Sequence, residues 1–179
     1  MKVTFIRIRP IRALVLLLTL GGITMAADQA RVRAILQPAN EREPAPQFAL
    51  KDSTDNLVSL KNYRGKVILL DFWATWCGGC KEEIPWFSEF ERKYGGKGFS
   101  VVGVSLDDDG WKVVKPFIQS AGVPYRIVLG DEETAKKYGI VNMPDTFLID
   151  RNGRIAAKYV GLVDKDDVES NIRAILTRL

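Results

Sequence analysis

The chain has 179 residues, of which 46% are hydrophobic and 27% charged, so its size and composition are those of one ordinary globular domain and exclude a disordered or fibrous protein. Its net charge of +4 arises from 26 basic and 22 acidic side chains, and four basic ones, Lys2, Arg7, Arg9 and Arg12, precede the first acid, Asp28. Without these four the balance is 22 against 22, which excludes a global positive field for a nucleic-acid partner.

The first 27 residues have the order of a secretory leader. Basic residues come first, an apolar run from Ala13 to Leu20 follows, and small residues surround Thr24 and Ala26. The run is shorter than the roughly 20 residues that cross a bilayer, which favours a cleaved signal peptide. Because position 24 is Thr rather than Ala, an uncleaved signal anchor stays open as an alternative. Either form predicts a periplasmic or extracytoplasmic protein, secreted or tethered to the membrane only through this segment.

Residues 28–46 are polar and alanine-rich, contain three prolines and show no sustained period, so they are predicted to be a linker. The folded domain is expected to span residues 47–179. It begins with a small hairpin, because two alternating stretches, Phe48–Lys51 and Leu57–Leu60, flank turn-forming residues.

Strand and helix patterns alternate over the rest of the chain. Val67–Trp73 is an apolar run typical of a strand buried on both faces. Further strands are predicted at 99–106, 125–129, 146–150 and 154–160, and helices at 81–94, 111–121, 132–138 and 164–179. This order predicts an α/β protein, a three-layer α/β/α sandwich with a mixed central sheet and an N-terminal β-hairpin extension.

Cys77 and Cys80 are the only cysteines, and they lie where the buried strand gives way to a helix. A separation of three residues places both in the first helical turn and on one face, within reach of a disulfide. The helix N-terminus stabilises a thiolate at the first position, which makes Cys77 the predicted nucleophile. Cys80 is then the resolving thiol that breaks the mixed disulfide.

Two other interpretations of the pair are weaker. A stapling disulfide normally joins distant segments, and a four-residue ring contributes only about 2 kcal/mol by the loop-entropy relation. A zinc site wants four ligands, whereas the chain has no histidine and no third cysteine. Redox chemistry is therefore favoured, with no metal and no bound cofactor expected.

Asp71 interrupts the apolar run, and a carboxylate in a strand buried on both faces is costly unless it is hydrogen-bonded or protonated. We expect Asp71 to have a raised pKa and to relay a proton, through water, to and from Cys80. The alternative is an ordinary solvated Asp at a frayed strand end. Pro144 precedes the strand at 146–150, and the sequence alone favours the trans form of its peptide bond.

Several motifs together resemble the thioredoxin superfamily, and within it the secreted or membrane-tethered TlpA and ResA type. The resemblance is carried by residues 71–81, Glu83, Pro85, Met143-Pro144 and residues 146–153, and it extends from about Pro46 to the C-terminus. It implies a thioredoxin-like fold for residues 47–179.

The resemblance also implies roles for residues outside the cysteine pair. Pro144 is expected to be a cis proline facing the cysteines, Met143 to pair through its backbone with an extended substrate, and Trp76 to flank the nucleophile. Asp71 matches the buried acid of thioredoxin itself. Glu83 matches a Glu-x-Pro pattern of the tethered type, although a solvated helix face explains it equally well.

The chain departs from the family pattern near the site. Gly78 and Gly79 separate the cysteines, and Gly79 stands where most relatives have proline, which adds an N–H donor and removes a rigid residue. Asp145 follows the cis proline where Thr is usual, so it is expected to oppose a thiolate and to select a basic or polar partner. Asn142 replaces a frequent Gly. These residues are candidate modulators of the potential.

The expected function is thiol-disulfide exchange with protein substrates outside the cytoplasm, as a reductase acting for example on an apocytochrome in cytochrome c maturation, with a membrane-bound electron donor. One alternative is a peroxiredoxin-like peroxide reductase, although its signature needs Thr at position 74, which is Ala, and Thr75 is one residue out of place. The other is a non-catalytic, redox-gated binding module that uses the proline groove.

Overall fold

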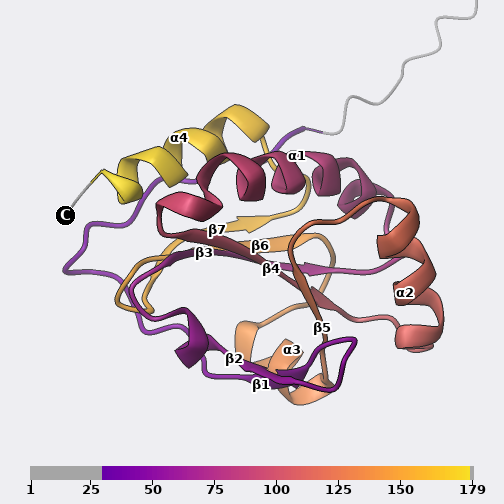
Figure 1. The fold of residues 1–179 in the computed structure, drawn as a ribbon. Coiled ribbons are helices and arrows are strands. Elements are labelled where there is room, and N and C mark those ends of the chain that lie inside the picture. The colour runs from indigo at the N-terminus through magenta and orange to yellow at the C-terminus, as the bar shows by residue number, and fades with distance from the viewer. Residues whose placement is uncertain (1–29, 178–179) are drawn as a thin grey trace, which may run out of the picture.

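The computed structural model describes residues 30–177, so the predicted leader lies outside the described residues (Figure 1). Its strands are β1 (Ala49–Lys51), β2 (Leu57–Ser59), β3 (Val67–Trp73), β4 (Phe99–Ser105), β5 (Arg126–Leu129), β6 (Asp145–Ile149) and β7 (Ile155–Val160). Its α-helices are α1 (Gly78–Tyr94), α2 (Trp111–Ser120), α3 (Glu132–Tyr138) and α4 (Lys165–Leu176). Between residues 30 and 177, none of the helices combines the length and the apolar content that crossing a bilayer needs.

The main sheet has the strand order β5-β4-β3-β6-β7, with β3 in its centre. β3 and β4 pair in parallel, as do β4 and β5, whereas β6 is antiparallel to both β3 and β7. β1 and β2 form a separate antiparallel hairpin, which is joined to β5 by a bridge between Asp52 and Val128. The mixed central sheet and the N-terminal hairpin predicted from the sequence are thus confirmed.

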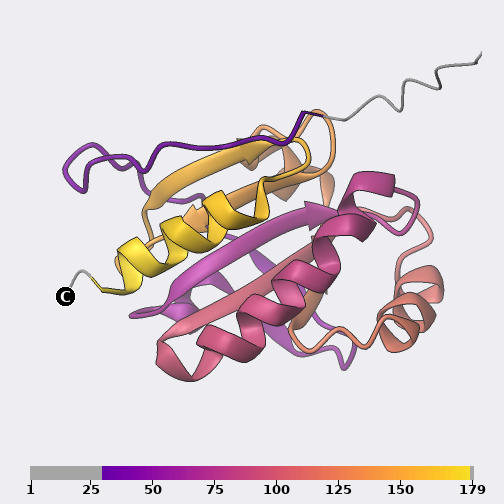
Figure 2. The same cartoon turned by 90° about the horizontal axis from the view of Figure 1, so that it is seen from above.

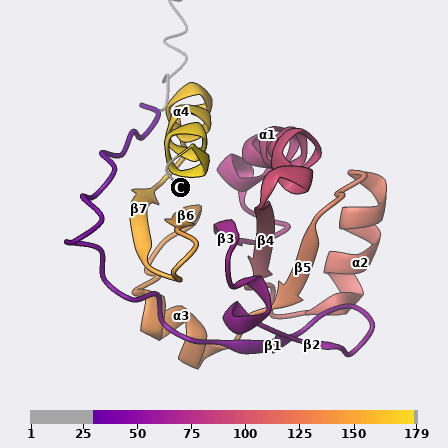
Figure 3. The same cartoon turned by 60° about the vertical axis from the view of Figure 1, so that its left-hand side comes forward.

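The sheet separates two hydrophobic cores. Helices α1, α2 and α4 cover one face, and α3 and the hairpin cover the other (Figure 3). Side chains alternate along β3, so Leu69 and Trp73 pack on the α1 side while Leu70 and Phe72 pack on the α3 side. Asp71 has the same parity as Leu69 and Trp73, which directs its side chain toward α1.

Helix α1 begins at Gly78, earlier than the predicted Lys81. Cys77 is its N-cap, and the Cys77 sulfur accepts a hydrogen bond from the backbone N–H of Cys80 at 3.2 Å. This bond satisfies one of the donors that the first turn of a helix leaves unpaired. The helix therefore starts at the cysteine pair itself and points its N-terminus at it. It ends at Tyr94, as the two glycines that follow predict.

The described part of the predicted linker, residues 30–46, differs from a free tether. It runs beside β7 and α4 in Figure 2 and exchanges backbone hydrogen bonds with the β7 region at Val32, Gln37, Glu43 and Ala45. Arg42 anchors it further, because its guanidinium donates to the Asp150 carboxylate at 2.9 Å with both side chains buried. This segment has no periodic pattern because it pairs irregularly, in isolated bridges rather than as a continuous strand.

Candidate active site

Cys77 and Cys80 form a disulfide at the start of α1, with their Cα atoms 5.3 Å apart. Cys77 is 6% exposed and Cys80 is completely buried. Cys77 is therefore the residue of the pair that contacts solvent. This geometry agrees with Cys77 as the attacking thiol and Cys80 as the resolving thiol.

The loop between β3 and α1 is fixed on both sides. The Cys77 backbone N–H donates to the Ala74 carbonyl at 3.1 Å, which closes a tight turn. Thr75, within that turn, donates both its backbone N–H and its hydroxyl to the carboxylate of Asp107, the second residue after β4. Trp76 follows and is 67% exposed, an unusual position for a tryptophan. The turn thus presents an aromatic surface directly before the nucleophile.

Pro144 lies against the cysteine loop, and the Met143–Pro144 peptide bond is cis. A Cβ placed on Gly79 would come within 3.3 Å of the Pro144 side chain, which shows how closely the two segments approach. Val141, three residues before this proline, is 86% exposed. Exposed apolar side chains thus occur in both loops, Trp76 directly before Cys77 and Val141 three residues before Pro144.

Asp71 is completely buried in the centre of β3. Its Oδ1 accepts a 3.3 Å hydrogen bond from the Thr146 hydroxyl on β6, and its Oδ2 has no partner among the described residues. Burial raises the pKa of Asp71 to about 7; the Thr146 hydrogen bond opposes this shift and the charge of Asp145 adds to it. A solvated Asp at a frayed strand end, the alternative interpretation of this residue, does not fit a fully buried side chain.

Glu83 is also completely buried, so the interpretation of Glu83 as part of a solvated helix face is wrong. The α1 helix turns this side chain inward, where its Oε1 accepts the backbone N–H of Val163 at 2.8 Å. Burial, followed by the charge of Asp71, raises the pKa of Glu83 to about 9. Two carboxyl groups with raised pKa values therefore lie between the sheet and α1, the helix that carries the cysteines.

Asp145 lies elsewhere. It has the parity of Phe147, which packs in the core on the α3 side, and its side chain is only 2% exposed. Its nearest basic group is Lys158, with Nζ 3.8 Å from Oδ2. Burial raises the pKa of Asp145, and Lys158 opposes the shift. Because Asp145 is buried on the α3 side of the sheet, the expectation that it selects a basic or polar partner is not supported.

Within the part of the chain that the structure describes, no buried basic side chain lies near the cysteines. Among residues 30–177 the only buried basic side chain is Arg42, which pairs with Asp150 beyond the far end of β6. A Cys77 thiolate is thus stabilised by the N-terminus of α1 but not by a buried cation.

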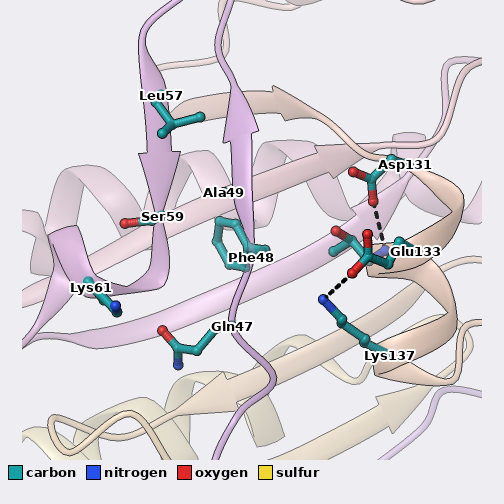
Figure 4. Close-up of a pocket in the computed structure, with 10 residues that line it drawn as sticks. Gln47, Phe48, Ala49, Leu57, Ser59, Lys61, Asp131, Glu133 and Lys137 are labelled. Atoms are coloured by element: carbon teal, nitrogen blue, oxygen red, sulfur yellow. Dashed lines mark hydrogen bonds and ion pairs between the residues drawn. The ribbon is translucent and has the colours of Figure 1, made fainter.

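A pocket of about 500 Å³ lies apart from the cysteines, between the β1–β2 hairpin and α3 (Figure 4). Several of its polar groups are already engaged. Asp131 caps α3 by accepting the Thr134 N–H at 2.7 Å, and Glu133 pairs with Lys137 at 2.6 Å. The pocket contains neither cysteine, so the disulfide and its surrounding loops are the candidate active site.

Comparison with known proteins agrees with this site. The Redoxin family model matches residues 40–176. The thiol-disulfide oxidoreductase ResA of Geobacillus thermodenitrificans is 33% identical over 132 residues, covering 73% of this chain and 75% of the relative. ResA of Bacillus cereus is 30% identical over 169 residues, covering 92% and 94%.

Among solved structures, a putative thiol:disulfide interchange protein DsbE from Chlorobium tepidum superimposes with a TM-score of 0.72 and 35% sequence identity. The match covers 82% of this chain and 99% of that structure. The chain therefore belongs to the Redoxin family and, within the thioredoxin superfamily, to the ResA-like thiol-disulfide oxidoreductases.

Proposed function

We propose that this oxidoreductase acts as a reductase of protein disulfides outside the cytoplasm. The observation that carries the direction is electrostatic: the described residues place buried carboxyl groups, and no buried cation, around the helix that bears the cysteines. Strong oxidants of this fold keep their reduced form stable through a strongly favoured thiolate. A site without that stabilisation favours the disulfide form and donates electrons.

The reaction begins when the Cys77 thiolate attacks one sulfur of the substrate disulfide. A mixed disulfide forms, and the other substrate sulfur leaves as a thiolate that takes a proton. Cys80 then loses its proton and attacks Cys77, which releases the second substrate sulfur. Two electrons pass to the substrate, and its two leaving sulfurs take up two protons, one from Cys80 by way of Asp71 and one from solvent, which received the proton of Cys77 when it ionised. The Cys77–Cys80 disulfide is the oxidised product.

Asp71 is proposed to accept the proton that Cys80 loses in the second step. Its pKa near 7 suits a group that must both take and return a proton at neutral pH. Glu83 shares the same buried region and is proposed to modulate this transfer. If Asp71→Asn left the rate of the Cys80 step unchanged across pH, the relay would be excluded.

The location and the partners rest on the sequence. The leader-like residues 1–27 support export, and they also support a membrane tether if they are not cleaved. The exposed Trp76, which directly precedes Cys77 in the chain, supports a protein substrate. We propose an apocytochrome or another thiol protein as the substrate, and a membrane-bound protein as the electron donor.

A trapping experiment tests this function. In Cys80→Ser the mixed disulfide cannot be resolved, so substrate proteins are expected to accumulate on Cys77 and to be released by dithiothreitol. Cys77→Ser is the matched control and is expected to trap nothing. Equal biological activity in both variants would instead show a binding module that does not need exchange.

A further inference from the structure

Asp107 is the polar residue most extensively bonded to the cysteine loop. Its Oδ1 accepts the Thr75 hydroxyl at 2.5 Å, and the Thr75 backbone N–H lies 3.1 and 3.0 Å from Oδ1 and Oδ2. The Ser105 hydroxyl donates to Oδ2 at 2.8 Å. Asp107 is 9% exposed, so these bonds form where competing water is largely excluded.

The contact between Thr75 and Asp107 joins two loops that are distant in sequence. β3 and β4 pair in parallel from Val67–Phe99 to Trp73–Ser105, so the loops that follow them leave the same edge of the sheet. The Leu106 N–H extends this pairing by donating to the Trp73 carbonyl at 2.9 Å. Asp107 is thereby held at a fixed point beside the turn that leads to Cys77.

Thr75 has little else to hold it. Its hydroxyl and its N–H both go to Asp107, and the residue is only partly buried. The next residue is the exposed Trp76, and the one after it is Cys77, whose sulfur caps α1. Any shift of Thr75 is therefore passed directly to the aromatic surface and to the nucleophile.

We propose that Asp107 is a positioning residue for disulfide exchange, acting through Thr75 to fix Trp76 and the Cys77 sulfur relative to a docked protein substrate. This inference rests on the proposed function only in requiring that Cys77 exchanges with protein disulfides, in either direction. A small misplacement of reacting groups can cost large factors in rate. The role needs both the carboxylate and the Thr75 hydroxyl.

The test compares Asp107→Asn, Thr75→Val and Thr75→Ser. Asp107→Asn keeps one acceptor oxygen but places an amide nitrogen where the second oxygen accepts the Thr75 N–H. Thr75→Val removes the hydroxyl without changing the charge. Ser restores the hydroxyl and is the rescue variant. Asp108→Asn is the matched control, because Asp108 is exposed, adjacent and has the same charge.

The readouts are the catalysed reduction of insulin disulfides by dithiothreitol and the alkylation of reduced Cys77 by iodoacetamide, both as functions of pH. For Asp107→Asn and Thr75→Val we expect the high-pH plateau with insulin to fall about tenfold. Alkylation, which needs no docked protein, is expected to change less than twofold. The double variant is expected to lose no more than either single one, and Thr75→Ser and Asp108→Asn to match the wild type.

Two outcomes would overturn the proposal. If the insulin plateau of correctly folded Asp107→Asn and Thr75→Val equals that of the wild type, Asp107 serves only stability. The proposal also fails if Asp107→Asn alone differs from the wild type and shifts the apparent pKa of Cys77 without lowering the insulin plateau. Asp107 would then act through its charge and not by holding Thr75 in place. The midpoint potential decides separately whether the protein is a reductase. A wrong direction of electron flow would therefore not produce either of these two results.

Discussion

At the residue scale, the chemistry depends on carboxyl groups whose burial disfavours the ionised form. Asp71 and Glu83 both have raised pKa values, and in each case burial is the largest cause. A group with a raised folded-state pKa holds its proton in the folded state after the unfolded chain has lost it. For an acid this means that stability decreases as pH rises between the ordinary pKa and the folded one.

Asp71→Asn is expected to stabilise the protein at high pH. The ordinary pKa of Asp is about 3.9 and the folded value is about 7, so the destabilisation by Asp71 develops between these pH values and is complete above about pH 8. Removing the charge is expected to raise the free energy of unfolding at pH 8 by on the order of 4 kcal/mol, and to change it little at pH 4. Urea unfolding at both pH values measures this. An equal change in the free energy of unfolding at pH 4 and pH 8 would contradict the raised pKa of Asp71.

The same variant is expected to lower the pKa of Glu83. The charge of Asp71 is the second cause of the raised Glu83 value, after burial. With Asn at position 71, the pKa of Glu83 is expected to fall below about 9 and to stay above its ordinary value. Titration of the Glu83 carboxyl carbon by NMR gives the result directly. Asp145→Asn is the control, with a smaller expected shift, because the charge of Asp145 affects the pKa of Glu83 less than that of Asp71 does.

At the element scale, local patterns predict most helices and strands but not the contacts between distant segments. The apolar run gives β3 as Val67–Trp73, and α3 also has its predicted bounds, because Asp131 caps its start and Gly139 ends it. The start of α1 differs because Cys77 caps it, a tertiary feature of the redox site. The packing of residues 30–46 depends on an ion pair between Arg42 and Asp150, which no local pattern reveals.

Arg42→Met tests whether this segment belongs to the folded body. Losing one partner of a buried pair leaves Asp150 buried with a charge, a cost of about 3 kcal/mol or more. Arg33→Met is the control, because its ion pair with Asp164 has the arginine 73% exposed and is worth about 1 kcal/mol or less. Urea unfolding of the two variants gives the comparison. Similar small losses would show that residues 30–46 contribute little to stability.

At the scale of the whole molecule, the site combines loops from both halves of the chain. The sequence identifies Cys77, Cys80 and Asp71 because they lie within one short motif. It leaves Glu83 open between two interpretations, since burial depends on how α1 packs. It does not reveal Asp107, because that contact exists only when β3 and β4 pair in parallel. The one feature of the sequence that points to Asp107 is the run of three acids, residues 107–109, directly after a predicted strand.

The central claim, a reversible dithiol couple that donates electrons, is tested most directly by its midpoint potential. The purified protein is equilibrated in graded thiol-disulfide buffers, and the fraction with the Cys77–Cys80 bond is scored. We expect a two-electron transition close to the roughly −270 mV of thioredoxin. A midpoint close to the roughly −120 mV of a strong oxidant would reverse the direction of electron flow, and the absence of a reversible transition would contradict the account altogether.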